Sequence, residues 1–93
     1  MARQVWKFPL LSTGPMWIEM PIGATIVLVD ADPATGLLAF WAEGEPIDAT
    51  EDRRFKIVGT GHPIPDRGMH RGSKVIGALV WHLYEIQEMP DAD

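Results

Sequence analysis

Short runs of β-branched and aromatic residues, separated by glycine, proline or aspartate, are the feature that most constrains this chain. Runs of this length and composition are typical of β-strands. The apolar periodicity of a helix, with contacts three and four residues apart, is hard to find along the 93 residues. The sequence therefore predicts an all-β fold, a small antiparallel sheet of about six strands curled into a sandwich or barrel.

The apolar pattern also predicts how the strands are arranged. Residues 24–29 are almost continuously apolar, which is the pattern of a strand buried on both faces, so we expect this strand at the centre of the sheet. The turn residues at 30–36 predict a hairpin with a strand at 37–43. Residues 74–86 are expected to form the longest strand, with Gly77 as a bulge. Further strands are expected at 4–10, 16–20 and 53–59.

The length of the chain suits one domain and is too short for two. We expect residues 1–86 to form a single β domain and residues 87–93 to form a disordered acidic tail. Residues 61–72 hold three glycines and two prolines without apolar periodicity, which predicts a long loop. The chain has no cysteine and no apolar run near the roughly 20 residues that cross a bilayer, so we expect a cytoplasmic protein without a membrane partner.

The charge is divided unevenly along the chain. The net charge of −5 argues against DNA or RNA as a partner, because a phosphate backbone needs a basic surface. Yet residues 53–74 hold six cationic side chains and one acid. This segment is either a solvated face beside acidic loops or a site for a compact phosphate-bearing ligand.

The segment Ile57-Val58-Gly59-Thr60-Gly61-His62-Pro63-Ile64-Pro65 is the most distinctive motif. Glycines let backbone N–H groups approach an anion, and Thr60 and His62 can donate hydrogen bonds to it. The motif lacks the third glycine of a dinucleotide fingerprint and the lysine of a P-loop. A tight turn that merely ends a strand, capped by His62, is the alternative interpretation.

Catalytic and metal-binding patterns are weak. His62 and His70 share the expected loop without a third ligand, and His82 lies in an expected strand, where a structural role is favoured. The acids at 48–52 are explained as solvating charge. The sequence therefore predicts a protein that is not an enzyme and needs no metal or cofactor. Trp41 and Trp81 are expected in the core, and any exposed tryptophan could stack on a nucleobase.

Several segments together resemble a family of small bacteriophage proteins whose activity is unassigned. The resemblance runs from Val5 to Glu85 and centres on the motif Phe-x-Ile-Val-Gly-Thr-Gly-His-Pro-Ile, which begins at Phe55. It implies a phage origin and a location in the host cytoplasm. The segments that carry it are Val5–Leu10, Ile18–Pro21, Gly23-Ala24, Trp41-Ala42, Phe55–Pro65 and Gly77–Glu85.

By analogy with phage proteins that act as oligomeric sponges, we expect this chain to sequester a cyclic nucleotide or a related nucleotide signal of host antiphage defence. A homo-oligomer is expected. The alternative is a protein-binding inhibitor of a host factor, or a virion accessory protein, acting through the acidic residues of 43–52. The expected ligand-binding residues are Arg53, Arg54, Thr60, Gly61, His62, Arg67, Arg71 and Trp41.

Overall fold

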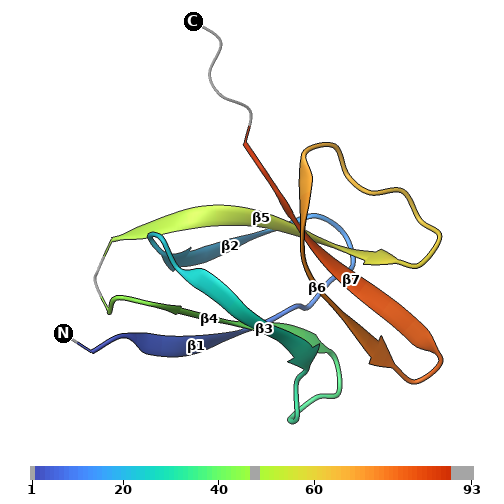
Figure 1. The fold of residues 1–93 in the computed structure, drawn as a ribbon, viewed down its shortest axis with the longest axis horizontal. Coiled ribbons are helices and arrows are strands. Elements are labelled where there is room, and N and C mark those ends of the chain that lie inside the picture. Colours follow the sequence, from blue (N-terminus) through green and yellow to red (C-terminus); the bar gives the residue numbers. More distant parts are fainter. Residues whose placement is uncertain (1, 47–48, 89–93) are drawn as a thin grey trace, which may run out of the picture.

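The computed structural model describes residues 2–46 and 49–88, in which all regular secondary structure is β-strand. The strands form two antiparallel sheets, one of three strands in the order β1-β4-β3 and one of four in the order β2-β5-β7-β6 (Figure 1). The predicted all-β class is therefore confirmed, with seven strands in place of about six. The strands are β1 (Gln4–Pro9), β2 (Met16–Pro21), β3 (Thr25–Ala31), β4 (Leu38–Gly44), β5 (Thr50–Gly59), β6 (Gly68–Ile76) and β7 (Leu79–Ile86).

Aromatic side chains join the two sheets. Phe40 of β4 contacts Phe55 of β5 across the core, with 4.8 Å between ring centroids, and Phe8 of β1 stacks on Phe40 at 5.1 Å. Phe40 and Phe55 are fully buried. Because successive side chains of a strand point to opposite faces, Arg54 and Lys56 lie on the other face of β5. The buried core is made of Leu10, Met20, Ala24, Leu38, Phe40, Ala42, Phe55, Ile57 and Leu83.

Strand β3 is an edge strand, so the prediction that it lies at the centre of the sheet was wrong. The central strand of this sheet is β4, and the predicted hairpin between the two is present. The register of β3 shifts between Ile26 and Leu28, which leaves Val27 in a bulge. Val27 and Leu28 are 49% and 46% exposed. The continuous apolar run therefore reflects a bulged edge strand with exposed apolar residues.

The expected single strand at 74–86 is a hairpin instead. Ile76 pairs with Leu79, and Gly77 between them has a φ of 62°, the left-handed conformation that glycine adopts without steric cost. The predicted loop at 61–72 is correspondingly too long, because β6 begins at Gly68 and pairs with β7. A register shift between His70 and Gly72 places a bulge at Arg71.

Strands β3 and β6 bring the edges of the two sheets side by side (Figure 1). Val29 packs so closely on Gly72 that a Cβ on this glycine would lie 2.6 Å from a Val29 methyl carbon. Lys74 forms an ion pair with Asp30 at 3.2 Å at the same edge. The close packing of Val29 on Gly72 explains why β6 carries a glycine at position 72, where a strand normally prefers a larger residue.

The connection between β5 and β6 runs the length of β7. Gly59 pairs with Trp81 near the start of β7, whereas Gly68 pairs with Ile86 at its end. The backbone N–H of Gln87 donates to the carbonyl of Arg67. Beyond Glu88, the expected tail lies outside the described residues. Within the described part of the chain, no helix has the length and apolarity to cross a membrane.

Candidate functional site

One carboxylate, that of Glu85, binds two of the arginines that were expected to bind phosphate. Arg53 donates to Glu85 from Nε at 2.7 Å and from Nη2 at 2.8 Å, and its Nη1 donates to the carbonyl of Ala24 at 2.6 Å. Arg71 donates to the same carboxylate at 2.9 Å. The side chains of Arg53 and Glu85 are only 14% and 12% exposed. Both arginines therefore belong to the packing of the fold.

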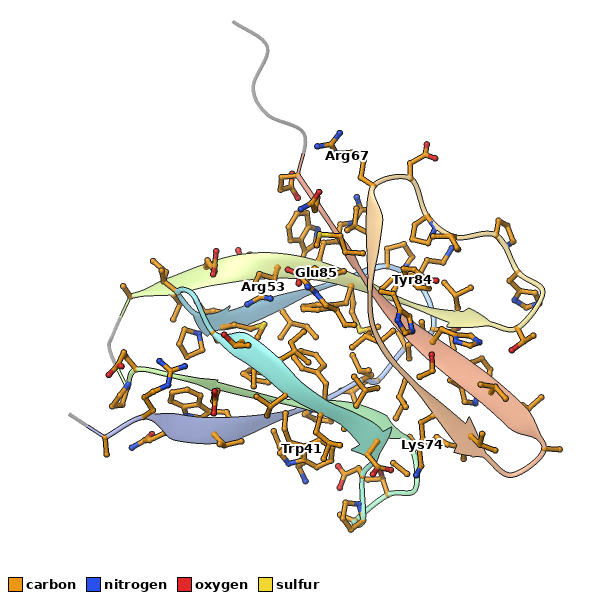
Figure 2. The ribbon with its side chains drawn as sticks, viewed as in Figure 1. Trp41, Arg53, Arg67, Lys74, Tyr84 and Glu85 are labelled. Atoms are coloured by element: carbon orange, nitrogen blue, oxygen red, sulfur yellow. The ribbon has the colours of Figure 1, made fainter. Side chains whose placement is uncertain are left out.

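The pKa values of this cluster follow from its contacts. Burial raises the pKa of Glu85, but the hydrogen bonds and charges of Arg53 and Arg71 outweigh burial and hold this pKa below its ordinary value. The hydrogen bond to Glu85 raises the pKa of Arg53. The cluster is therefore fully charged at neutral pH, and Figure 2 shows Arg53 and Glu85 side by side.

Arg67 and the Gly-Thr-Gly-His turn lie at opposite ends of β7. The guanidinium of Arg67 donates to the backbone carbonyls of Gln87 and Glu88, both at 3.2 Å. At the other end, the N–H of His62 donates to the carbonyl of Gly59 at 3.1 Å, which closes a turn over residues 59–62. Gly61 has a φ of 91° there, as the third residue of a type II turn requires. The turn and Arg67 therefore do not form one site.

Trp41 lies on the far side of the smaller sheet. It pairs with Lys7 and Leu28, and its neighbour Phe40 points into the core, so Trp41 faces away from the larger sheet. Figure 2 shows it well apart from Arg53 and Arg67. The predicted ligand-binding residues are thus divided. Four arginines line one open surface pocket around Glu85, whereas Thr60, Gly61, His62 and Trp41 lie elsewhere; the four arginines are Arg53, Arg54, Arg67 and Arg71.

The acidic segment expected to meet a protein partner has internal contacts. Glu43 and Glu45 bind Arg3 at 3.8 and 3.5 Å, and the carboxylate of Glu51 accepts a hydrogen bond from the N–H of Gly23 at 2.9 Å. Residues 47–48 lie outside the described part of the chain. Three carboxylates of this segment therefore have contacts within the fold: those of Glu43 and Glu45 with Arg3, and that of Glu51 with the turn before β3.

A different set of residues gathers on the face of the four-stranded sheet that points away from the core. Side chains that alternate with the core positions of β2, β5, β7 and β6 form this surface, which we call the outer face. The strand register places them in three adjacent rows. The rows are Trp17, Arg54 and Ile86; then Lys56, Tyr84 and His70; then Val58, His82 and Ser73, with Thr60 just beyond.

Arg54 is a cation of this face that has no acceptor among the described residues. Its guanidinium carbon lies 5.7 Å from the ring centroid of Trp17, in cation–π contact. Its Nε is buried and has no hydrogen-bond partner among the described residues. Neither Arg54 nor Lys56 forms an ion pair within residues 2–46 and 49–88. Trp17 is 56% exposed, more than the other three tryptophans, so a cation and an accessible aromatic ring stand together.

A chain of hydrogen bonds connects four polar side chains on the other two rows. Thr60 Oγ1 lies 3.0 Å from His82 Nε2, and His82 Nδ1 lies 2.6 Å from Ser73 Oγ. Ser73 Oγ in turn lies 2.7 Å from His70 Nε2. The His70 ring packs at 5.4 Å from the ring of Tyr84. We call these four residues the polar chain, and all of them remain at least partly exposed.

Among the residues of the outer face, sequence reasoning selected only Arg54 and Thr60 as ligand-binding residues. His82 was interpreted as a structural histidine, and His70 was assigned to a loop because the glycines at 68 and 72 concealed β6. If β6 had been recognised in the sequence, the alternation of side chains along it would have placed His70 on the same face as His82. In the described part of the chain, no three His, Cys, Asp or Glu side chains are grouped to hold a metal ion.

Comparison with known proteins places the chain in a family. Residues 1–92 match the model of the family described as a domain of unknown function, DUF7352, and the chain belongs to that family. No curated protein and no solved structure matches it.

Proposed function

We propose that this protein binds a compact, phosphate-bearing nucleotide on the outer face of its four-stranded sheet and releases it chemically unchanged. The observation that carries the proposal is Arg54, a half-buried guanidinium whose Nε lacks an acceptor. Nε itself is covered, but the same guanidinium has no carboxylate among the described residues, so its outer N–H groups can form charge-assisted hydrogen bonds with a phosphate oxygen. The arginines at 53 and 71 already have a carboxylate, so they do not compete for this role.

The outer face also offers what the rest of a nucleotide needs. A base stacked on an exposed aromatic ring contributes about 1–3 kcal/mol, and Trp17 is such a ring. Lys56 provides a second cation in the next row. The seven residues from Arg54 to Thr60 are separated by six steps and span about 20 Å along β5 and just beyond it, which is long enough for a dinucleotide. The net charge of −5 favours a compact ligand over a long nucleic acid.

We also propose a biological role: a phage-encoded protein that sequesters a cyclic nucleotide, or a related nucleotide signal, of host antiphage defence. The support for this role is the resemblance of residues 5–85 to small phage proteins and the analogy with oligomeric sponges. A sponge needs high affinity without turnover. The role therefore requires that the ligand be recovered intact after binding.

The first experiment is thermal unfolding against cyclic dinucleotides, cyclic trinucleotides, NAD-derived signals and mononucleotides. A ligand at 100 times its dissociation constant adds about 2.7 kcal/mol to the free energy of unfolding. For a domain of this size, that corresponds to a rise of about 10–20 °C in Tm. A rise with one class, and recovery of that ligand intact by mass spectrometry, supports the proposal. No rise with any member, or a cleaved product, contradicts it.

The proposal includes a homo-oligomer. Val75 and Leu79, at the β6–β7 hairpin, are 61% and 57% exposed in the single chain. A small domain gains stability when such residues are covered by a second copy. Sedimentation equilibrium tests this expectation, and a monomer at all concentrations, with or without nucleotide, would contradict it.

A further inference from the structure

The polar chain carries a further inference, which rests on the proposed function and adds a ligand subsite to it. We infer that Thr60, His82, Ser73 and His70 form a subsite for a phosphate group of the nucleotide, and that this subsite opens when both histidines are protonated. Two imidazoles share one hydroxyl here, at 2.6 and 2.7 Å from Ser73 Oγ. The number of protons that the two imidazoles carry therefore decides which hydroxyl groups of the polar chain can donate to a ligand.

With both histidines neutral, the polar chain satisfies itself. A neutral imidazole has one donor and one acceptor nitrogen, and a hydroxyl has one donor proton and two acceptor lone pairs. The three hydrogen bonds of the polar chain can then form together in two ways. Either every donor hydrogen points toward the Thr60 end of the polar chain, or every donor hydrogen points toward the His70 end. In both directions the hydroxyl proton of Ser73 is used by an imidazole. The same holds after one proton is added, since the remaining neutral ring still accepts from Ser73.

A second proton changes this arrangement. Both rings now donate to Ser73 Oγ, which accepts two hydrogen bonds and turns its own proton outward. His82 Nε2 donates to Thr60, so the hydroxyl proton of Thr60 points away from the ring, where the Val80 carbonyl at 3.5 Å and a ligand are its possible acceptors. Two positive rings stand 6.3 Å apart, a repulsion that a bound anion relieves. Protonation and anion binding therefore favour each other reciprocally.

The charges around the polar chain favour an anion. Lys56 and Tyr84 lie in the same row as His70, and Lys56 adds a third positive charge. Glu19 and Asp52 pair with each other on the outer face and supply its carboxylates in the described rows. They lie on the far side of the Arg54 row from the polar chain.

Other charged groups near the polar chain are engaged or point elsewhere. Glu85 and Lys74 are bound to Arg53 and Asp30 on the inner side of the sheet. In the β5–β6 connection, Asp66 is next to Arg67, at the Gly68 end.

The test uses inorganic sulfate, a tetrahedral dianion whose charge does not change over the relevant pH range. Sulfate is titrated into the protein at about pH 5 and about pH 8, the range in which histidine changes charge, and the imidazole and Ser73 signals are followed by NMR. If binding requires one protonated histidine, the affinity for sulfate falls about 30-fold between these two pH values. If binding requires two, it falls about 1,000-fold. We expect a change well above 30-fold, with the shifts confined to the polar chain.

Three variants separate this inference from a general effect of acid. His70→Gln should reduce the pH dependence to that of one histidine, and Ser73→Ala should weaken sulfate binding at least about tenfold at low pH. His62→Gln is the matched control. A Cβ on Gly59 would meet both the His62 ring and the Trp81 ring at 3.5 Å, so His62 lies with Trp81 on the inner side of the sheet, away from the polar chain, and its replacement should leave the pH dependence unchanged.

The outcomes distinguish this inference from the proposed function. Sulfate affinity that is the same at both pH values, or that responds equally to His70→Gln and His62→Gln, overturns the inference. It is also overturned if sulfate does not bind while a nucleotide raises the Tm, and in each of these cases the proposed function stands. If neither sulfate nor any nucleotide binds, both the inference and the proposed function fail.

Discussion

Glu85 accepts two parallel hydrogen bonds from Arg53, from Nε at 2.7 Å and from Nη2 at 2.8 Å, while Nη1 of the same arginine reaches the carbonyl of Ala24. The two-bond geometry is the strong form of an arginine–carboxylate contact. It ties β5 and β7 of the larger sheet to the segment that leads into β3. An arginine that looks like a ligand contact in the sequence is therefore a structural member of the fold.

Replacement Glu85→Gln should destabilise the fold. The amide carries no charge, so Arg53 is left without its carboxylate in a largely buried place, and the more exposed Arg71 also loses its ion pair. We expect the free energy of unfolding to fall by about 2 kcal/mol, as for the loss of a hydrogen bond to a charged group. Urea denaturation measures this. Glu45→Gln, at an exposed site, should change stability by no more than about 0.5 kcal/mol, and equal effects of the two variants would refute the assignment.

The same carboxylate should make stability depend on acid pH. The pKa of Glu85 is lowered in the folded state from an ordinary value of 4.5, so its stabilising contribution is complete above pH 4.5 and is lost as the pH falls through the lower folded value. Asp30 and Asp32 also have lowered pKa values and add to the acid sensitivity. The difference between wild type and Glu85→Gln should therefore shrink as the pH falls below 4.5. A difference that stays constant with pH would contradict this prediction.

Gly72→Ala should loosen the contact between β3 and β6. The added methyl group would lie 2.6 Å from Val29, so one strand must move. We expect a loss of about 1–3 kcal/mol, the usual cost of overpacking. Gly14→Ala is the control, because its Cβ would meet only Ser12 Oγ at an ordinary 3.6 Å. Thermal unfolding of both variants decides the matter, and a neutral Gly72→Ala would show that the edges are not tightly packed.

The strand pattern predicted the fold class because it depends on local alternation. Phe55 and Ile57 point to the core, and Arg54 and Lys56 point away, as the alternating residues of this strand indicate. The position of β3 was not predictable in the same way. Its apolar run is also compatible with an edge strand, because the bulge at Val27 turns apolar residues to the surface.

The predicted site depended on contacts between distant residues, which local sequence does not reveal. Nothing near Arg53 in the sequence indicates Glu85, 32 residues away, as its partner. Likewise, the hydrogen bonds of Ser73 to His70 and His82 depend on the pairing of β6 with β7. Arg54 was identified because its exposure follows from the alternation of a single strand. Its unsatisfied Nε could be seen only in the structure.

The most direct test of the central claim is the nucleotide affinity of Arg54→Gln compared with that of Arg3→Gln. Arg3 is an equally charged arginine, but it lies at the smaller sheet and binds Glu43 and Glu45. With the nucleotide that raises the Tm most, isothermal titration should show at least about a tenfold loss of affinity for Arg54→Gln, the value of one charge-assisted hydrogen bond. Arg3→Gln should bind like the wild type. Equal affinities of wild type and both variants would contradict the claim that the outer face binds the ligand.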